Sequence, residues 1–169
     1  MTRDQKIVAT GAASGVAAML LAMWALYSVL PAPVAADRLG SIVYALSWQP
    51  LAALPLLLMI GAVGNARAMG PAIDPTLGAE DPAMRINIRV LDNTLQQFVL
   101  FAAGSMGLAA SLDPASVNVV GAAAVVFVAA RLAFWIGYRI HPLYRAAGFA
   151  GTAYLNGGLI VAALWSAAT

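Results

Sequence analysis

Long apolar segments recur along the whole chain, and short polar or proline-rich stretches separate them. A helix needs roughly 20 apolar residues to cross the hydrocarbon core of a bilayer. With 62% hydrophobic and 9% charged residues, the composition is typical of polytopic membrane proteins and excludes an ordinary soluble domain. The sequence therefore predicts an all-α integral membrane protein, with spans at residues 7–30, 42–63, about 85–112, 115–138 and 149–165 with its flanks.

The first segment, residues 7–30, allows two interpretations. Small residues at 34–36 resemble the cleavage site of a signal peptide. However, signal peptides have an apolar region of about 7–15 residues, and this one is longer, so we favour an uncleaved helix. Gly11 and Gly15 form a GxxxG pattern, which in so alanine-rich a segment we attribute to chance rather than to helix packing.

Prolines shape the second segment and the stretch after it. Pro50 and Pro55 remove backbone donors inside residues 42–63, so we expect a kink near the middle, where Gln49 is available to satisfy a freed carbonyl. Residues 64–84 are rich in glycine, proline and acidic side chains, which predicts an extramembrane loop, the longest in the chain.

Basic residues gather on one side of the predicted topology. Five spans place three segments on the same side of the membrane: the amino terminus, the 64–84 loop with the start of the following helix, and residues 139–145. This side carries Arg3, Lys6, Arg67, Arg85, Arg89, Arg139 and Arg145, whereas the other side has only Arg38. The positive-inside rule therefore predicts a cytoplasmic amino terminus and an external carboxyl terminus.

The residue types present limit the kinds of functional site that the chain can form. The chain has no cysteine and one histidine, His141, so we predict no disulfide, no cysteine nucleophile and no zinc or iron site, and we give His141 no catalytic role. The basic residues are spread along the chain without forming a patch, so we predict no nucleic-acid partner.

The stretch RINIRVLDNTLQQF at residues 85–98 is a dense polar cluster that runs directly into an apolar helix. Residues three, four and seven apart share a helix face, which predicts one polar stripe of Arg85, Arg89, Asp92, Asn93 and Gln96. Counting back from Leu112 places Asn93 and Gln96 at or just inside the membrane boundary. At that depth they must face protein or water.

Arg131 lies well inside the fourth span, where an unpaired charge is expensive. Two interpretations remain open from the residues: a structural pair with Asp92, the nearest carboxylate, or a role in ligand binding. Asn156 in the fifth span is expected to hold helices together by hydrogen bonding.

At these residues the chain resembles the MAPEG family, the membrane-associated proteins of eicosanoid and glutathione metabolism. The family's pattern Arg-x-x-x-Asn-x-x-Glu matches Arg89, Asn93 and Gln96. Its pattern Arg-x-x-Tyr-x-x-Gly-Tyr, followed seven residues later by Arg, matches Arg131, Phe134, Gly137, Tyr138 and Arg145. The resemblance covers about residues 42–165.

The resemblance implies an antiparallel four-helix transmembrane bundle at residues 42–169, with residues 1–41 adding an amino-terminal transmembrane helix and linker. It implies a homotrimer in the bacterial inner membrane that holds glutathione between subunits near the cytoplasmic face. Lipophilic small-molecule electrophiles would arrive through the membrane lipids. The implied glutathione contacts are Arg89, Asn93, Gln96, Arg131 and Tyr138, with Arg67 from the neighbouring subunit, and Arg145 would stabilise the thiolate.

Two departures from the family pattern leave an alternative open. Gln96 stands where the family has Glu, and Phe134 stands where a Tyr is common. The alternative is a non-catalytic relative that keeps the fold and binds another anion or a partner helix in its polar groove. A purely structural interpretation of these residues is also open, in which the arginines of the third span reach to lipid headgroups and Tyr138 is an interfacial tyrosine.

Overall fold

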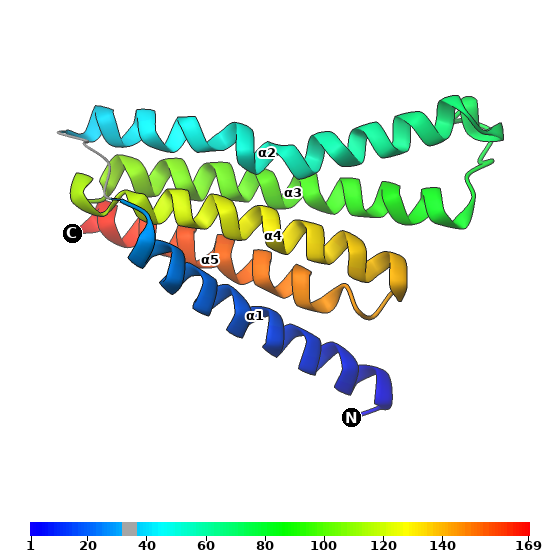
Figure 1. Cartoon of the computed structure of the whole chain (residues 1–169), viewed down its shortest axis with the longest axis horizontal. Coiled ribbons are helices and arrows are strands. Elements are labelled where there is room, and N and C mark those ends of the chain that lie inside the picture. Colours follow the sequence, from blue (N-terminus) through cyan, green and yellow to red (C-terminus); the bar gives the residue numbers. More distant parts are fainter. Residues whose placement is uncertain (32–36) are drawn as a thin grey trace.

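The computed structural model describes residues 1–31 and 37–169, and helices make up nearly all of these ranges (Figure 1). The all-helical prediction is confirmed. The long helices are α1 (Arg3–Val29), α2 (Arg38–Ala68), α3 (Pro82–Ser111), α4 (Asn118–Ile140) and α5 (Ala146–Ala168), with 3₁₀ turns η1 (Pro71–Ile73) and η2 (Pro114–Ser116) between them. The cleavage-site pattern at 34–36 lies outside the described residues.

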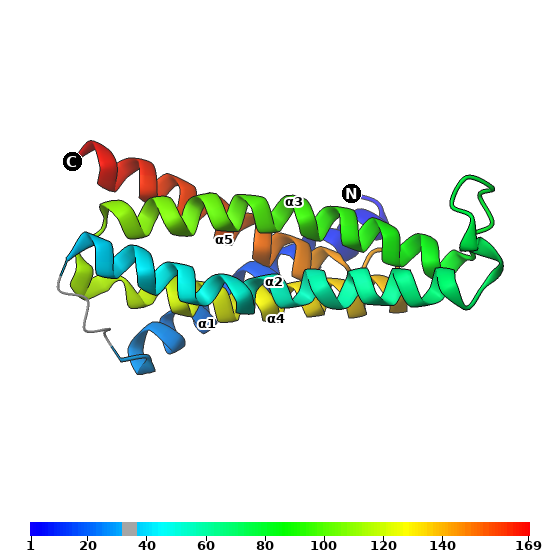
Figure 2. The same ribbon diagram turned by 90° about the horizontal axis from the view of Figure 1, so that it is seen from above.

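Successive helices run in alternating directions (Figures 1 and 2). The amino terminus, the α2–α3 loop and the α4–α5 loop lie at one end of the bundle, and the carboxyl terminus lies at the other. We call the first of these the basic end, because the seven arginines and lysines expected on one side belong to its loops and the adjoining helix ends. The alternation on which the predicted topology depends is therefore present.

Four helical segments within the described residues are long and apolar enough to cross a membrane: α1, α2, α4 together with η2, and α5. Helix α3 is not among them, because the polar residues of 85–98 occupy its first half. Its 30 residues nevertheless extend for about 45 Å, and it lies beside α2 in both views (Figures 1 and 2).

Helix α2 bends near its middle, as its two prolines predict (Figure 1). Gln49 lies beside the bend, and its amide donates to the Ser105 hydroxyl of α3 at 3.0 Å and to the Ala45 carbonyl at 3.4 Å. Farther along, the Phe101 and Phe127 rings pack in the core of α3, α4 and α5 with centroids 4.8 Å apart.

The α2–α3 loop is shorter than the predicted residues 64–84. Helix α2 continues past Gly64 to Ala68, and α3 already begins at Pro82, where the Asp81 carboxylate accepts from the Met84 amide at 2.7 Å. Proline fits the first helical position, since its missing N–H has no intrahelical partner there. These two helix ends leave a loop of residues 69–81.

Helix α1 is fixed to the bundle at two places. At its middle, a Cβ added at Gly15 would overlap the Ala147 carbonyl oxygen and lie 2.8 Å from the Ala147 Cα. At its carboxyl end, the Asn118 amide donates to the carbonyls of Leu30 (3.2 Å) and Tyr27 (3.4 Å). Attributing the GxxxG pattern to chance was therefore wrong, because only a glycine at position 15 lets α1 come this close to α5.

Candidate functional site

Arg131 is completely buried between α3, α4 and α5, with 0% of its side chain exposed. Its Nε and Nη2 donate to the Thr94 hydroxyl at 3.2 and 2.8 Å, and Nη2 also donates to the side-chain oxygen Oδ1 of Asn93 at 3.1 Å. Nη1 donates to the Thr152 hydroxyl at 3.1 Å, and the guanidinium lies 4.1 Å from the centroid of the Phe134 ring. The charge is thus held by uncharged oxygens and an aromatic face.

The pairing of Arg131 with Asp92 is wrong. Asp92 is exposed, and it projects about 100° around α3 from Asn93, so its carboxylate points out of the bundle. Sequence reasoning also missed Thr94 and Thr152 as partners. A signal existed for Thr94, because it lies on the same helix face as the buried Val90, Gln97 and Phe101, which turns it towards the core.

A second polar contact lies about one helical turn farther from the basic end than the hydrogen bonds of Arg131. The Asn156 amide donates to the side-chain oxygen of Gln97 at 2.8 Å and to its backbone carbonyl at 2.9 Å. This confirms that Asn156 links α5 to α3. Nearer the basic end, the Trp135 indole donates to the Asn87 side chain at 2.9 Å. The inward face of α3 is therefore hydrogen-bonded to α4 and α5 over several turns.

Arg145 and Tyr138 come together at the basic end. The Arg145 guanidinium lies 5.1 Å from the centroid of the Tyr138 ring, a distance at which a cation and an aromatic face attract. Tyr138 is buried and packs edge-on against Phe134, whereas Arg145 is exposed. Within the described part of the chain Arg145 has no carboxylate partner, so its charge is available to an anion.

The outer face of α3 carries Arg89, Asp92 and Gln96, all exposed in the single chain. The predicted stripe is therefore divided: these residues face outwards, and the half-buried Asn93 lies between them and Arg131. Gln96 is about 10 Å farther along α3 than Arg89. Polar side chains inside the hydrocarbon core are unfavourable against lipid.

Arg67 is engaged elsewhere. Its Nη2 forms an ion pair with the Glu80 carboxylate at 3.1 Å, and Nη1 donates to the Ala72 carbonyl at 3.4 Å, which ties the two ends of the 69–81 loop together. In the same loop the Thr76 hydroxyl donates to Asp74 at 2.6 Å, and this bond lowers the pKa of the Asp74 carboxyl below its usual value. The structure does not bring Arg67 to the other predicted site residues of its own chain.

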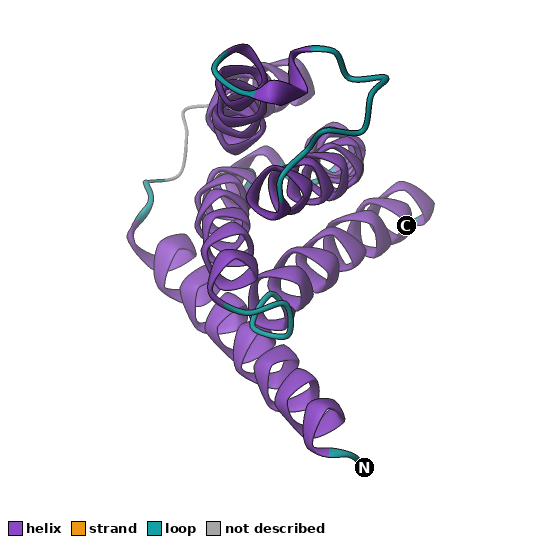
Figure 3. Cartoon of the chain, turned by 90° about the vertical axis from the view of Figure 1, so that its right-hand side faces the viewer, coloured by secondary structure: helices purple, strands orange, loops and turns teal. Residues whose placement is uncertain are grey.

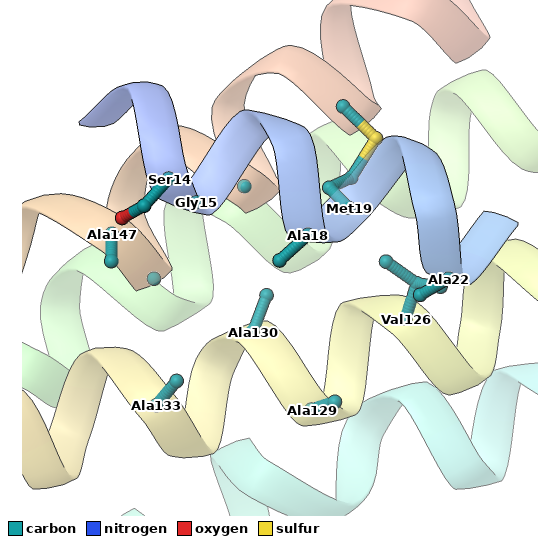
Figure 4. Close-up of a pocket in the computed structure, with 12 residues that line it drawn as sticks. Ser14, Gly15, Ala18, Met19, Ala22, Val126, Ala129, Ala130, Ala133 and Ala147 are labelled. Carbon is teal, nitrogen blue, oxygen red and sulfur yellow. The ribbon is translucent and has the colours of Figure 1, made fainter. Parts of the chain in front are cut away.

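Two apolar cavities flank α1. One of about 400 Å³ is lined by small side chains of α1, α4 and α5, including Ala18, Ala130 and Ala147 (Figure 4). The other, of about 390 Å³, lies between α1 and α5, and Arg145 stands at its wall beside Phe149 and Tyr154. Arg145 is thus the one predicted site residue that lines either of these two cavities.

A model of the MAPEG family matches residues 12–165. No curated protein and no solved structure matches the chain. The family match begins inside α1, before the expected boundary at residue 42, so the division of the chain at that residue stays a prediction. The match covers most of the chain and includes both motifs. The chain is therefore a multi-pass integral membrane protein that belongs to the MAPEG family.

Proposed function

We propose that the protein is an integral-membrane glutathione transferase or peroxidase that acts on lipophilic electrophiles. The observation that carries the proposal is Arg145, an exposed guanidinium held against Tyr138 at the basic end with no carboxylate partner among the described residues. A guanidinium beside a sulfur atom lowers the thiol pKa and raises the fraction of nucleophilic thiolate at neutral pH. The thiol itself must come from a ligand, since the chain contains no cysteine.

The other proposed contacts lie on two faces. Arg89, Asn93 and Gln96 offer a guanidinium and two amides from α3, and Tyr138 offers its hydroxyl from α4. Arg131 donates to Asn93 and is closed off from the surface, so it would act on glutathione by holding the Asn93 amide. Arg67 would reach a neighbouring subunit only by leaving Glu80.

A homotrimer would explain the polar outer face of α3. If a second chain covers Arg89, Asp92 and Gln96, these side chains are removed from lipid and a closed polar pocket forms between subunits. The same proposal places the basic end in the cytoplasm and the protein in a bacterial inner membrane, in keeping with the positive-inside rule. In mild detergent the protein should have the mass of three chains, and a stable monomer would contradict the intersubunit site.

The direct test is turnover by the purified protein in liposomes. With glutathione and a membrane-soluble electrophile, such as a long-chain α,β-unsaturated aldehyde, we expect a conjugate to form faster than in empty liposomes. An Arg139→Ala variant serves as control, because Arg139 is also basic and exposed at the same end. A wild-type rate equal to that of empty liposomes would contradict a transferase with this substrate class.

A non-catalytic relative is the second candidate, and Gln96 favours it. An amide in place of the family's carboxylate cannot neutralise the glutathione amino group. If the polar face of α3 instead binds another anion or a partner helix, the trimer would persist without any glutathione-dependent turnover.

A further inference from the structure

We infer that helix α1 positions Arg145, because Gly11 and Gly15 hold the first turn of α5 in place. This inference rests on the proposed function, in which Arg145 stabilises the thiolate. It assigns a task to the helix that precedes the four-helix bundle implied by the family motifs.

Gly11 and Gly15 of α1 come closest to α5 at the two residues that directly follow Arg145. A Cβ added at Gly11 would lie 3.3 Å from the Cβ of Ala146, and one added at Gly15 would overlap the Ala147 carbonyl oxygen. Figure 4 shows Gly15 beside Ala147. In Figure 3, which looks onto the basic end, α1 passes next to the α4–α5 loop. No side chain separates the two backbones at this crossing.

Helix α4 closes in on the same turn from the other side. A Cβ at Gly148 would overlap the Phe134 amide nitrogen and lie 2.5 Å from the Ala130 carbonyl oxygen. The first turn of α5 is therefore clamped between α1 and α4. Since α4 also carries Tyr138, the clamp fixes Arg145 relative to the ring on which its guanidinium lies.

Arg145 follows any movement of this turn. The Phe149 amide donates to the Arg145 carbonyl at 3.0 Å, which makes Arg145 the first backbone acceptor of α5. A Cβ at Gly137 would lie 2.7 Å from the Tyr144 carbonyl, so the residue before Arg145 also lies directly on α4. With Asn118 holding the far end of α1, α1 cannot slide freely to relieve a collision at Gly15.

The test is Gly15→Ala, with Gly157→Ala as the matched control. The new Cβ at position 15 forces α1 and α5 apart, whereas a Cβ at Gly157 meets nothing within 4 Å. Misplacing a catalytic group by about 1 Å can cost up to roughly a hundredfold in rate. For Gly15→Ala we therefore expect a fall in kcat of about tenfold or more, with the KM for glutathione little changed and a weaker ultraviolet thiolate signal.

A second measurement needs no activity. Arg145→Cys places the only thiol in the chain, and its rate of reaction with a water-soluble maleimide reports how residue 145 is held. We expect a faster reaction when Gly15→Ala is added and an unchanged rate when Gly157→Ala is added. An unchanged rate in the Gly15→Ala background would overturn the inference, whether or not the protein is a transferase.

Kinetics and labelling together separate the two proposals. A faster maleimide reaction with unchanged kcat and thiolate signal would show that α1 holds the turn without positioning Arg145, which also overturns the inference. A wild-type protein without turnover would count against the proposed function. In that case the rate of the maleimide reaction would be the one measurement that tests whether α1 positions residue 145.

Discussion

Replacing Thr94 with valine is expected to lower the free energy of unfolding by about 3 kcal/mol, because the buried charge of Arg131 loses two of its hydrogen bonds. The Thr94 hydroxyl accepts two of the four hydrogen bonds that Arg131 donates. Valine keeps the shape of threonine and removes the acceptor. Unfolding in mixed micelles, followed by circular dichroism as the fraction of denaturing detergent rises, measures the loss.

Two further variants make this measurement specific. Thr10 is exposed on α1, and its hydroxyl bonds only to the carbonyls of its own helix, so Thr10→Val should change stability by less than about 0.5 kcal/mol. Arg131→Met removes the charge and keeps much of the volume, and apolar replacements of buried charges are often well tolerated. We therefore expect Arg131→Met to be more stable than Thr94→Val. The reverse order would contradict the assignment of Thr94 as the main partner of the charge.

The second large effect is expected on thiolate formation and on kcat of the glutathione-dependent reaction. Arg145→Ala should abolish the ultraviolet thiolate signal of bound glutathione and lower kcat by roughly a hundredfold, the cost typical of losing one group that stabilises developing or full negative charge. The affinity for glutathione should be reduced much less, since the residues proposed to bind the carboxylates of glutathione lie on α3. The measurement pairs a difference spectrum with steady-state kinetics.

Arg139→Ala is again the matched control for this substitution. Both arginines are exposed at the basic end, but of the two only Arg145 lies over the Tyr138 ring. An equal loss of signal in both variants would show that the general positive charge of this end, rather than Arg145, stabilises the thiolate. Full activity in Arg145→Ala would remove Arg145 from the mechanism.

The sequence was sufficient where one physical rule governs the outcome. Segment length and apolar content predicted the helices, and the prolines predicted the bend in α2. The count of five spans predicted which loops share an end. Asn156 was correctly expected to link helices, because a buried amide in an apolar segment must find a partner on a neighbouring helix.

The sequence was insufficient where the contacts of a residue depend on which neighbouring helix packs against it. Helical spacing placed Asp92 and Asn93 in one stripe, but only the packing of α4 shows that Asn93 turns towards Arg131 and Asp92 does not. The GxxxG pattern of α1 could not be distinguished from chance among so many alanines, since its meaning depends on the backbone of Ala147 being close. Loop ends also shifted, because helix caps such as Asp81 depend on local geometry.

Binding of glutathione by the polar groups of the basic end can be measured by calorimetric titration of the detergent-solubilised protein. We predict saturable heat release for the wild type at glutathione concentrations up to about 1 mM. The Gln96→Glu variant should bind more tightly, because it restores the family's carboxylate on the outer face of α3. If neither protein releases heat with glutathione at millimolar concentration, the glutathione site is contradicted, and the non-catalytic relative becomes the better description.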